Sequence, residues 1–86
     1  MSKLSSGVFS ITAGILVPRS VVNAKSLMPL DGAIRVWYGP YEGSASSLLL
    51  EGRLVPVSTS LEHVMSHAGI ITMVAVTGTV KIHEVI

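Results

Sequence analysis

Cysteine is absent from this chain, and charged and aromatic side chains are few. Without cysteine the fold has neither disulfides nor thiolate ligands for zinc. Charged residues make up 13% of the 86 residues, which is about half their share in an average soluble domain. The six basic and five acidic residues give a net charge of +1 and form no basic stripe. We therefore expect no nucleic-acid partner.

Long apolar runs are also absent. No stretch approaches the roughly 20 consecutive apolar residues of a membrane-spanning helix. The mildly apolar start, residues 1–17, is interrupted by Ser5, Ser6, Ser10 and Thr12 and makes a poor signal peptide. We expect a protein that is made in the cytoplasm and has no membrane partner.

Apolar residues are nevertheless abundant, at 49% of the chain. A chain of this length forms a single domain, residues 1–86, and buries only about 60–65% of its extended surface. Some apolar side chains must then stay on the surface, where large apolar patches usually mark contact sites. We predict a homo-oligomer or a stable complex with another protein; the alternative is a monomer rich in Val and Ile.

The residue types are those of β-strands, because Val, Ile and Thr dominate and turn signals recur about every 8–12 residues. We predict an all-β fold, a small sandwich or jelly-roll-like barrel of about 6–7 strands. The first predicted strand is residues 7–17, which bends at Gly14 and is ended by Pro18. Two further strands are predicted at residues 33–38 and 47–57. Residues 69–76 and 79–86 are predicted to form a C-terminal hairpin around the turn Thr77-Gly78, in which Val80 and Ile82 face the core and Glu84 lies at its edge.

Residues 58–68 fit two structures. Leu61, Val64, Met65 and Ala68 follow helical spacing, with Ser60 as a possible N-cap and Gly69 as a stop. This pattern predicts one short helix near residues 60–68. A strand is the alternative, since all-β chains often override weak helical patterns.

Residues 18–32 have the turn residues of a connection but carry Val21, Val22, Leu27 and Met28. A connection surrounded by water should be polar, so another surface must cover this apolar arm. It either folds over the core of its own domain or docks on a neighbouring subunit. We place these four residues in a predicted interface.

Three of the four aromatic residues lie within the five positions of Trp37-Tyr38-Gly39-Pro40-Tyr41. Aromatic rings with a polar group are favoured at protein interfaces, so Trp37 and Tyr41 join the predicted interface. Two other interpretations stay open: Trp37 or Tyr38 fills the core while Tyr41 braces the turn, or the rings stack on a sugar.

Catalytic and metal-binding patterns are weak. No serine lies in a nucleophile turn, no glycine-rich phosphate loop is present, and the acidic residues are well separated. His63 and His67 are four residues apart and would share one face of a helix, but zinc needs further ligands and His83 is the only other histidine. We predict no metal, no cofactor and no enzymatic activity.

Residues 32–40 and 71–86 resemble the aromatic strand and the closing hairpin of small bacteriophage virion proteins. The resemblance implies a domain without an active site that decorates a capsid or builds a tail, usually as a trimer. We accordingly expect a structural protein of the virion, made in a host cytoplasm: a capsid decoration (cement) or head-stabilising protein whose partners are its own copies and a larger protein shell or tail. The alternative is a glycan- or receptor-binding β module that uses residues 37–41.

Overall fold

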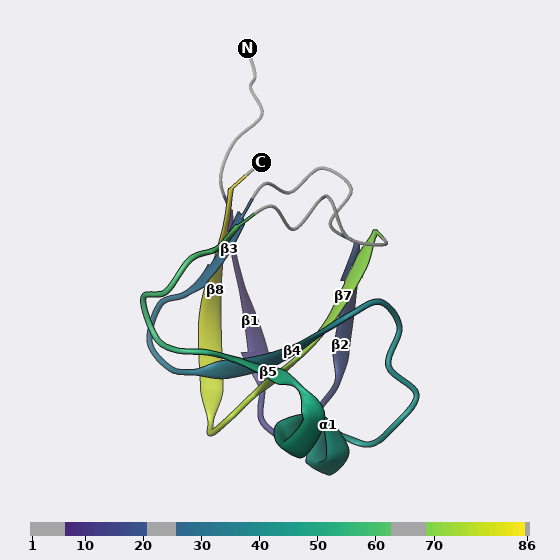
Figure 1. Cartoon of the computed structure of the whole chain (residues 1–86). Coiled ribbons are helices and arrows are strands. Elements are labelled where there is room, and N and C mark those ends of the chain that lie inside the picture. Colours follow the sequence, from purple (N-terminus) through teal and green to yellow (C-terminus); the bar gives the residue numbers. More distant parts are fainter. Residues whose placement is uncertain (1–6, 21–25, 63–68, 86) are drawn as a thin grey trace.

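The computed structural model describes residues 7–20, 26–62 and 69–85, which form a sandwich of two antiparallel sheets (Figure 1). The first sheet has the strand order β1 (Gly7–Thr12), β8 (Thr79–Val85), β3 (Ser26–Pro29), β6 (Leu61–Glu62). The second has the order β2 (Val17–Ser20), β7 (Ile70–Ala75), β4 (Ile34–Tyr38), β5 (Arg53–Val55). One helix, α1 (Ala45–Glu51), joins β4 to β5 among the described residues. The predicted all-β sandwich is confirmed.

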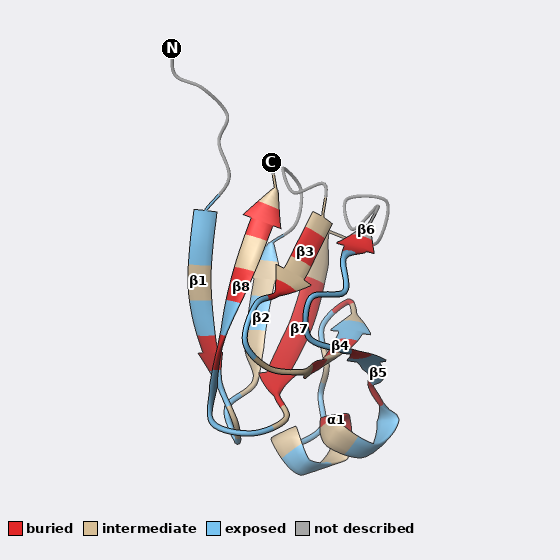
Figure 2. Cartoon of the chain, turned by 90° about the vertical axis from the view of Figure 1, so that its left-hand side faces the viewer, coloured by how far each residue is buried: buried red, intermediate tan, exposed pale blue. Residues whose placement is uncertain are grey.

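The core lies between the two sheets, where alternate residues of each strand point inward (Figure 2). In β8 the inward residues Val80, Ile82 and Glu84 are buried, as the alternation predicted. In β4 the inward residues are Ile34 and Val36. The buried core residues come from strands of both sheets: Ile11, Leu27, Ile34, Val36, Val55, Leu61, Ile71, Met73, Ala75, Val80 and Ile82.

The predicted C-terminal hairpin is wrong, although its two strands exist. β7 pairs with β2 and β4, whereas β8 pairs with β1 and β3. The turn at Thr77-Gly78 therefore carries the chain from one sheet to the other, and the two arms face each other across the core. A turn signal marks where a chain reverses but does not say which strand becomes the neighbour.

The predicted bend at Gly14 is confirmed. The strand predicted at residues 7–17 ends at Thr12 as β1, and β2 begins only at Val17. Gly14 has a φ of +83°, which glycine adopts without steric cost. Pro18 does not end the pairing as predicted; it lies inside β2, opposite Thr72 of β7. Proline is tolerated there because β2 is an edge strand of its sheet.

The strand predicted at residues 47–57 is wrong for its first half, which forms α1. Ser44 begins the helix because its Oγ accepts a hydrogen bond from the Ser47 N–H at 3.2 Å. The helix ends at Gly52, where a Cβ would lie 2.8 Å from the Leu48 carbonyl oxygen. Of the helix predicted near residues 60–68, Leu61–Glu62 form strand β6 and residues 63–68 lie outside the described residues.

The connecting arm predicted at residues 18–32 contains strands at both ends. Val17–Ser20 is β2, and Ser26–Pro29 is β3, which lies between β8 and β6 inside the first sheet. The apolar residues of β3 are explained by this position, because Leu27 points into the core and is fully buried. Residues 21–25 lie outside the described residues.

Candidate functional site

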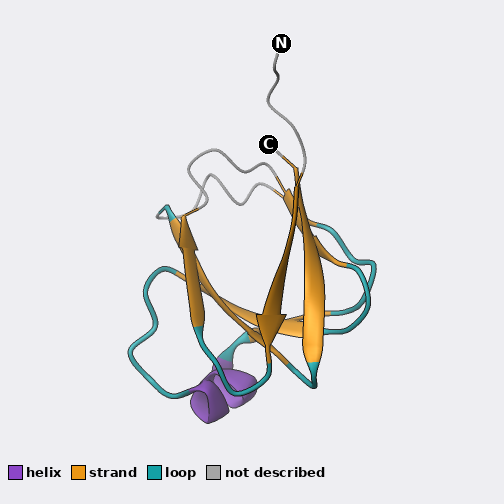
Figure 3. Cartoon of the chain, turned by 180° about the vertical axis from the view of Figure 1, so that it is seen from behind, coloured by secondary structure: helices purple, strands orange, loops and turns teal. Residues whose placement is uncertain are grey.

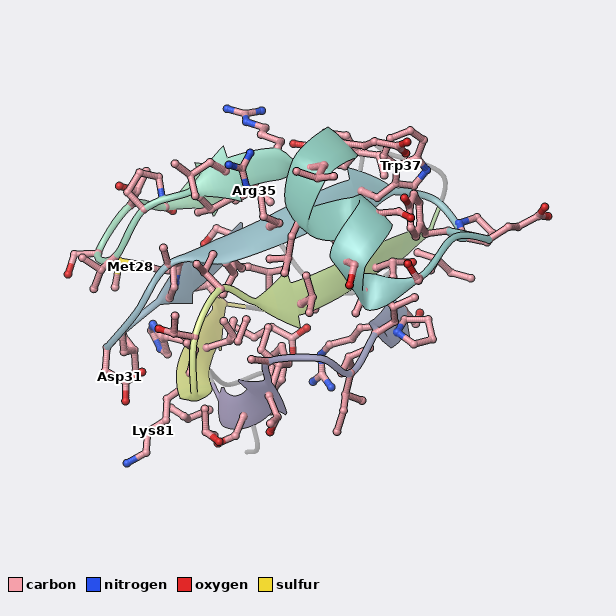
Figure 4. All side chains as sticks on the ribbon, turned by 90° about the horizontal axis from the view of Figure 1, so that it is seen from below. Met28, Asp31, Arg35, Trp37 and Lys81 are labelled. Carbon is pink, nitrogen blue, oxygen red and sulfur yellow. The ribbon has the colours of Figure 1, made fainter. Side chains whose placement is uncertain are left out.

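The four described residues of the predicted interface do not form one surface. Val21 and Val22 lie outside the described residues. Leu27 is fully buried in the core of its own domain and cannot contact a partner in the folded state. Met28 lies half-buried on the outer face of the first sheet, opposite His83, whereas Trp37 and Tyr41 belong to the second sheet and the loop after β4. Figure 4 shows Met28 and Trp37 well apart.

The outer face of the second sheet is partly covered by α1, which packs over β4 and β7 and lies at one end of the strands (Figure 3). Val74 of β7 is opposite Arg35, an outward residue of β4, yet Val74 is fully buried. Leu48 is the buried residue of α1. Arg35 Nη1 donates a hydrogen bond to the Gly52 carbonyl oxygen at 2.9 Å. Apolar contact and this hydrogen bond together hold α1 against the sheet.

The three aromatic residues at positions 37–41 have different surroundings: Tyr38 and Tyr41 make hydrogen bonds within the domain, whereas Trp37 is exposed. Tyr38 packs against the core, and its hydroxyl accepts a hydrogen bond from Arg53 Nη1 at 3.1 Å. The Tyr41 hydroxyl donates to Glu51 Oε1 at 2.9 Å, which ties the loop after β4 to the end of α1. Partial burial, and then the Glu51 carboxylate, raise the pKa of Tyr41 above its ordinary value.

Trp37 is the member of the cluster that remains open to solvent. It alternates with the inward residues Val36 and Tyr38, and 39% of its surface is exposed. Its ring contacts that of Tyr41 with a centroid separation of 5.2 Å and an interplanar angle of 59°. Trp37 is therefore held in place on one side and available to a partner on the other (Figure 4).

Further exposed apolar side chains come from the same stretch of chain as Trp37. Leu50 of α1 is 85% exposed, and Leu54 of β5 and Val57 are also exposed. We call Trp37, Leu50 and Leu54 the β4–α1–β5 surface. The sequence predicts none of Leu50, Leu54 and Val57 as contact residues. For Leu50 the reason is that residues 47–57 are predicted as a strand where α1 forms; Ser44 and Gly52, which bound the helix, are the signals that could identify it.

An ion pair connects the two sheets inside the sandwich. Arg19 Nη2 lies 2.9 Å from Glu84 Oε1, and Arg19 Nε donates to Glu84 Oε2 at 3.3 Å. The Arg19 guanidinium also stacks on the Phe9 ring, 3.7 Å from its centroid. Both carboxylate oxygens of Glu84 are thus engaged in holding β2 against β8, which is a structural role.

No cluster of metal-binding side chains is found in the part of the chain that the structure describes. Across residues 7–20, 26–62 and 69–85, no three His, Asp or Glu side chains lie close enough together to hold a metal ion. His83 lies half-buried on the outer face of the first sheet, while His63 and His67 are outside the described residues. None of the described helices is long and apolar enough to cross a membrane.

Comparison with known proteins adds no relative. No protein-family model, curated protein or solved structure matches this chain.

Proposed function

We propose that this protein is a structural subunit of a larger protein assembly and that it acts through apolar contacts of the β4–α1–β5 surface. The observation that carries the proposal is the exposure of Leu50. Leu48 and Leu50 lie on the same short helix, and Leu48 is fully buried whereas Leu50 is 85% exposed. Burying a leucine side chain is worth about 1.5–3 kcal/mol, so a partner that covers Leu50 gains affinity directly.

The neighbouring residues support the same use of this surface. Trp37 is a residue type enriched among the side chains that dominate binding energy, and it is already held by Tyr41, so little side-chain freedom is lost on binding. Leu54 is exposed and lies opposite Arg35, on the same outward face of the sheet as Trp37. Exposed apolar patches are typical of contact sites.

The assembly proposed is a bacteriophage virion, in which the protein decorates or stabilises the head as a trimer bound to a larger shell. The resemblance of residues 32–40 to the aromatic strand of small virion proteins supports this choice; the resemblance of residues 71–86 to a closing hairpin does not, because β7 and β8 belong to different sheets. The fold also supports this choice, because a small β-sandwich without cysteine gains stability when copies bind one another.

Analytical ultracentrifugation over a range of concentrations tests the contact surface. We expect the natural chain to associate and Leu50→Lys or Leu54→Lys to weaken the association by about tenfold or more, because a charge is then buried in the contact. Thr77→Lys, which adds the same charge at an exposed turn between β7 and β8, is the matched control. Association that all three variants leave unchanged would refute the proposed surface.

A glycan- or receptor-binding module is the second candidate, and the exposed ring of Trp37 favours it. Aromatic rings stack on sugars, and the Glu51 carboxylate lies close by through Tyr41. A glycan array distinguishes this function: glycan binding that disappears in Trp37→Ala and persists in Leu50→Lys supports it. Circular dichroism of both variants checks that the fold is intact.

A further inference from the structure

The open edge of β1 differs from the other sheet edges. The described edges of the two sheets are β1, β6, β2 and β5. β2 contains Pro18, β5 has three residues and begins with the exposed Arg53, and β6 has two residues. Proline, charge and short length are the usual protections of an edge against pairing with another chain. β1 is six residues long and has neither proline nor a charged side chain.

The backbone of β1 presents an ordered set of hydrogen-bonding groups at this edge. Ala13 N–H donates to the Gly78 carbonyl at 2.8 Å, in continuity with the β1–β8 register. Because antiparallel strands alternate their hydrogen-bonding direction, Phe9 and Ile11 bond to β8, and the N–H groups of Val8, Ser10 and Thr12 point away from it. Among the described residues, β8 is the only strand that pairs with β1, and Figure 2 shows β1 as the outermost strand of its sheet.

We infer that β1 pairs with β1 of a second copy of this chain, antiparallel about a two-fold axis, so that the first sheets of two molecules become one continuous sheet. The inference rests on the proposed function only in treating the chain as an assembly subunit, since it uses a different surface. A row of backbone donors and acceptors is matched by another extended strand. A second copy fits because β1 carries no charge that would repel itself.

The register follows from matching the three outward residues. Centring the axis on Ser10 places Ser10 opposite Ser10 of the other copy and Val8 opposite Thr12. Each Ser10 N–H then donates to the Ser10 carbonyl of the other copy, and each Thr12 N–H donates to the Val8 carbonyl. Val8 is exposed on the outer face in the single chain, and the pairing covers it with the partner's Thr12 side chain.

The expected strength of this contact is low. A seam between two six-residue strands buries less than the roughly 800 Å² per partner of a standard stable complex. It contributes through repetition, because many weak contacts in one assembly act together. The two-fold contact would therefore join subunits or trimers that other surfaces already hold.

A charge-swap experiment at Ser10 tests the pairing. Ser10 is exposed, so Ser10→Lys and Ser10→Glu should each leave the fold intact, which circular dichroism checks. In each variant two like charges face each other across the axis, and we expect the dissociation constant for the two-fold contact to rise by about tenfold or more. Measured by sedimentation at high concentration, the mass of the assembly should then be halved. An equimolar mixture of the two variants should restore the mass of the natural assembly.

The outcomes separate this inference from the proposed function. If Ser10→Lys halves the mass, the mixture restores it and Leu50→Lys changes nothing, the β1 pairing stands and the proposed apolar surface fails. If Leu50→Lys disrupts the assembly and the Ser10 variants do not, the β1 pairing is overturned and the apolar surface stands. A natural chain that stays monomeric at high concentration, or a mixture that does not recover, also overturns the β1 pairing.

Discussion

Arg19 is the residue whose removal should have the clearest effect on stability outside the apolar core. Its guanidinium neutralises Glu84, whose side chain is only 10% exposed, while that of Arg19 is 36% exposed. Breaking a buried pair leaves an uncompensated charge and costs about 3–5 kcal/mol; the partial exposure of Arg19 lowers this cost. We predict that Arg19→Met lowers the free energy of unfolding by about 2 kcal/mol, as measured by urea denaturation at neutral pH.

The double variant Arg19→Met/Glu84→Gln is the control for this ion pair. Arg19→Met leaves the buried Glu84 carboxylate without its ion-pair partner. Replacing this carboxylate with a neutral amide removes the unpaired charge, so the double variant should recover part of the lost stability. If both variants are equally destabilised, the contribution of Arg19 comes from its stacking on Phe9. A loss below about 0.5 kcal/mol in the single variant, as for an ordinary surface position, would contradict the role given to the pair.

The helix α1 offers a comparison within one element. Leu48 and Leu50 are the same residue type on the same seven-residue helix, one fully buried and the other 85% exposed. We predict that Leu48→Ala lowers the free energy of unfolding by about 3 kcal/mol and that Leu50→Ala changes it by less than about 0.5 kcal/mol. Thermal and urea denaturation at low protein concentration measure both. Equal losses at the two positions would mean that Leu50 is also packed, against the assignment of Leu50 to the contact surface.

Elements with clear alternation could be predicted from the sequence. In β4 and in the first part of β8 the inward positions are apolar, so the strand and its inward face follow from the pattern, and Glu84 continues the inward face of β8. Leu48-Leu49-Leu50 has no period that separates a helix from a strand. Only the flanking residues Ser44 and Gly52 decide it, through a side-chain hydrogen bond and a close backbone contact.

Strand partners and exposure were harder to predict, because both depend on distant residues. The turn at Thr77-Gly78 is visible in the sequence, but β7 is flanked by β2 and β4, which no local pattern specifies. The sequence predicts Leu27 as a contact residue because the turn residues around it indicate a connection, whereas it lies in strand β3 and points into the core. For the candidate site, the aromatic cluster predicts Trp37 either in the core or at an interface, and the structure leaves it 39% exposed. The exposure of Leu50 follows only from the position of α1.

At the scale of the whole molecule, the two ends of the described chain are neighbours in one sheet. Gly7 of β1 is opposite Glu84 of β8, so the pairing joins residues separated by nearly the whole length of the chain. The connections β1–β2, β2–β3, β3–β4 and β7–β8 each pass from one sheet to the other. Most strand pairs therefore join residues that are far apart in the sequence, which is typical of all-β domains that fold in milliseconds to seconds.

The central place of β8 makes the C-terminal strand necessary for the whole fold. β8 lies between β1 and β3 and supplies Val80 and Ile82 to the core. We predict that a chain ending at Gly78 does not fold, because β1 and β3 both lose their partner and the remaining strands cannot close the core. Circular dichroism and the absence of a cooperative thermal transition are the measurements. A chain ending at Val85, which keeps β8 complete, is the control and should unfold cooperatively. Cooperative unfolding of the shorter chain would mean that the second sheet and α1 suffice as a folding unit, and the division of the core between the two sheets would have to be redrawn.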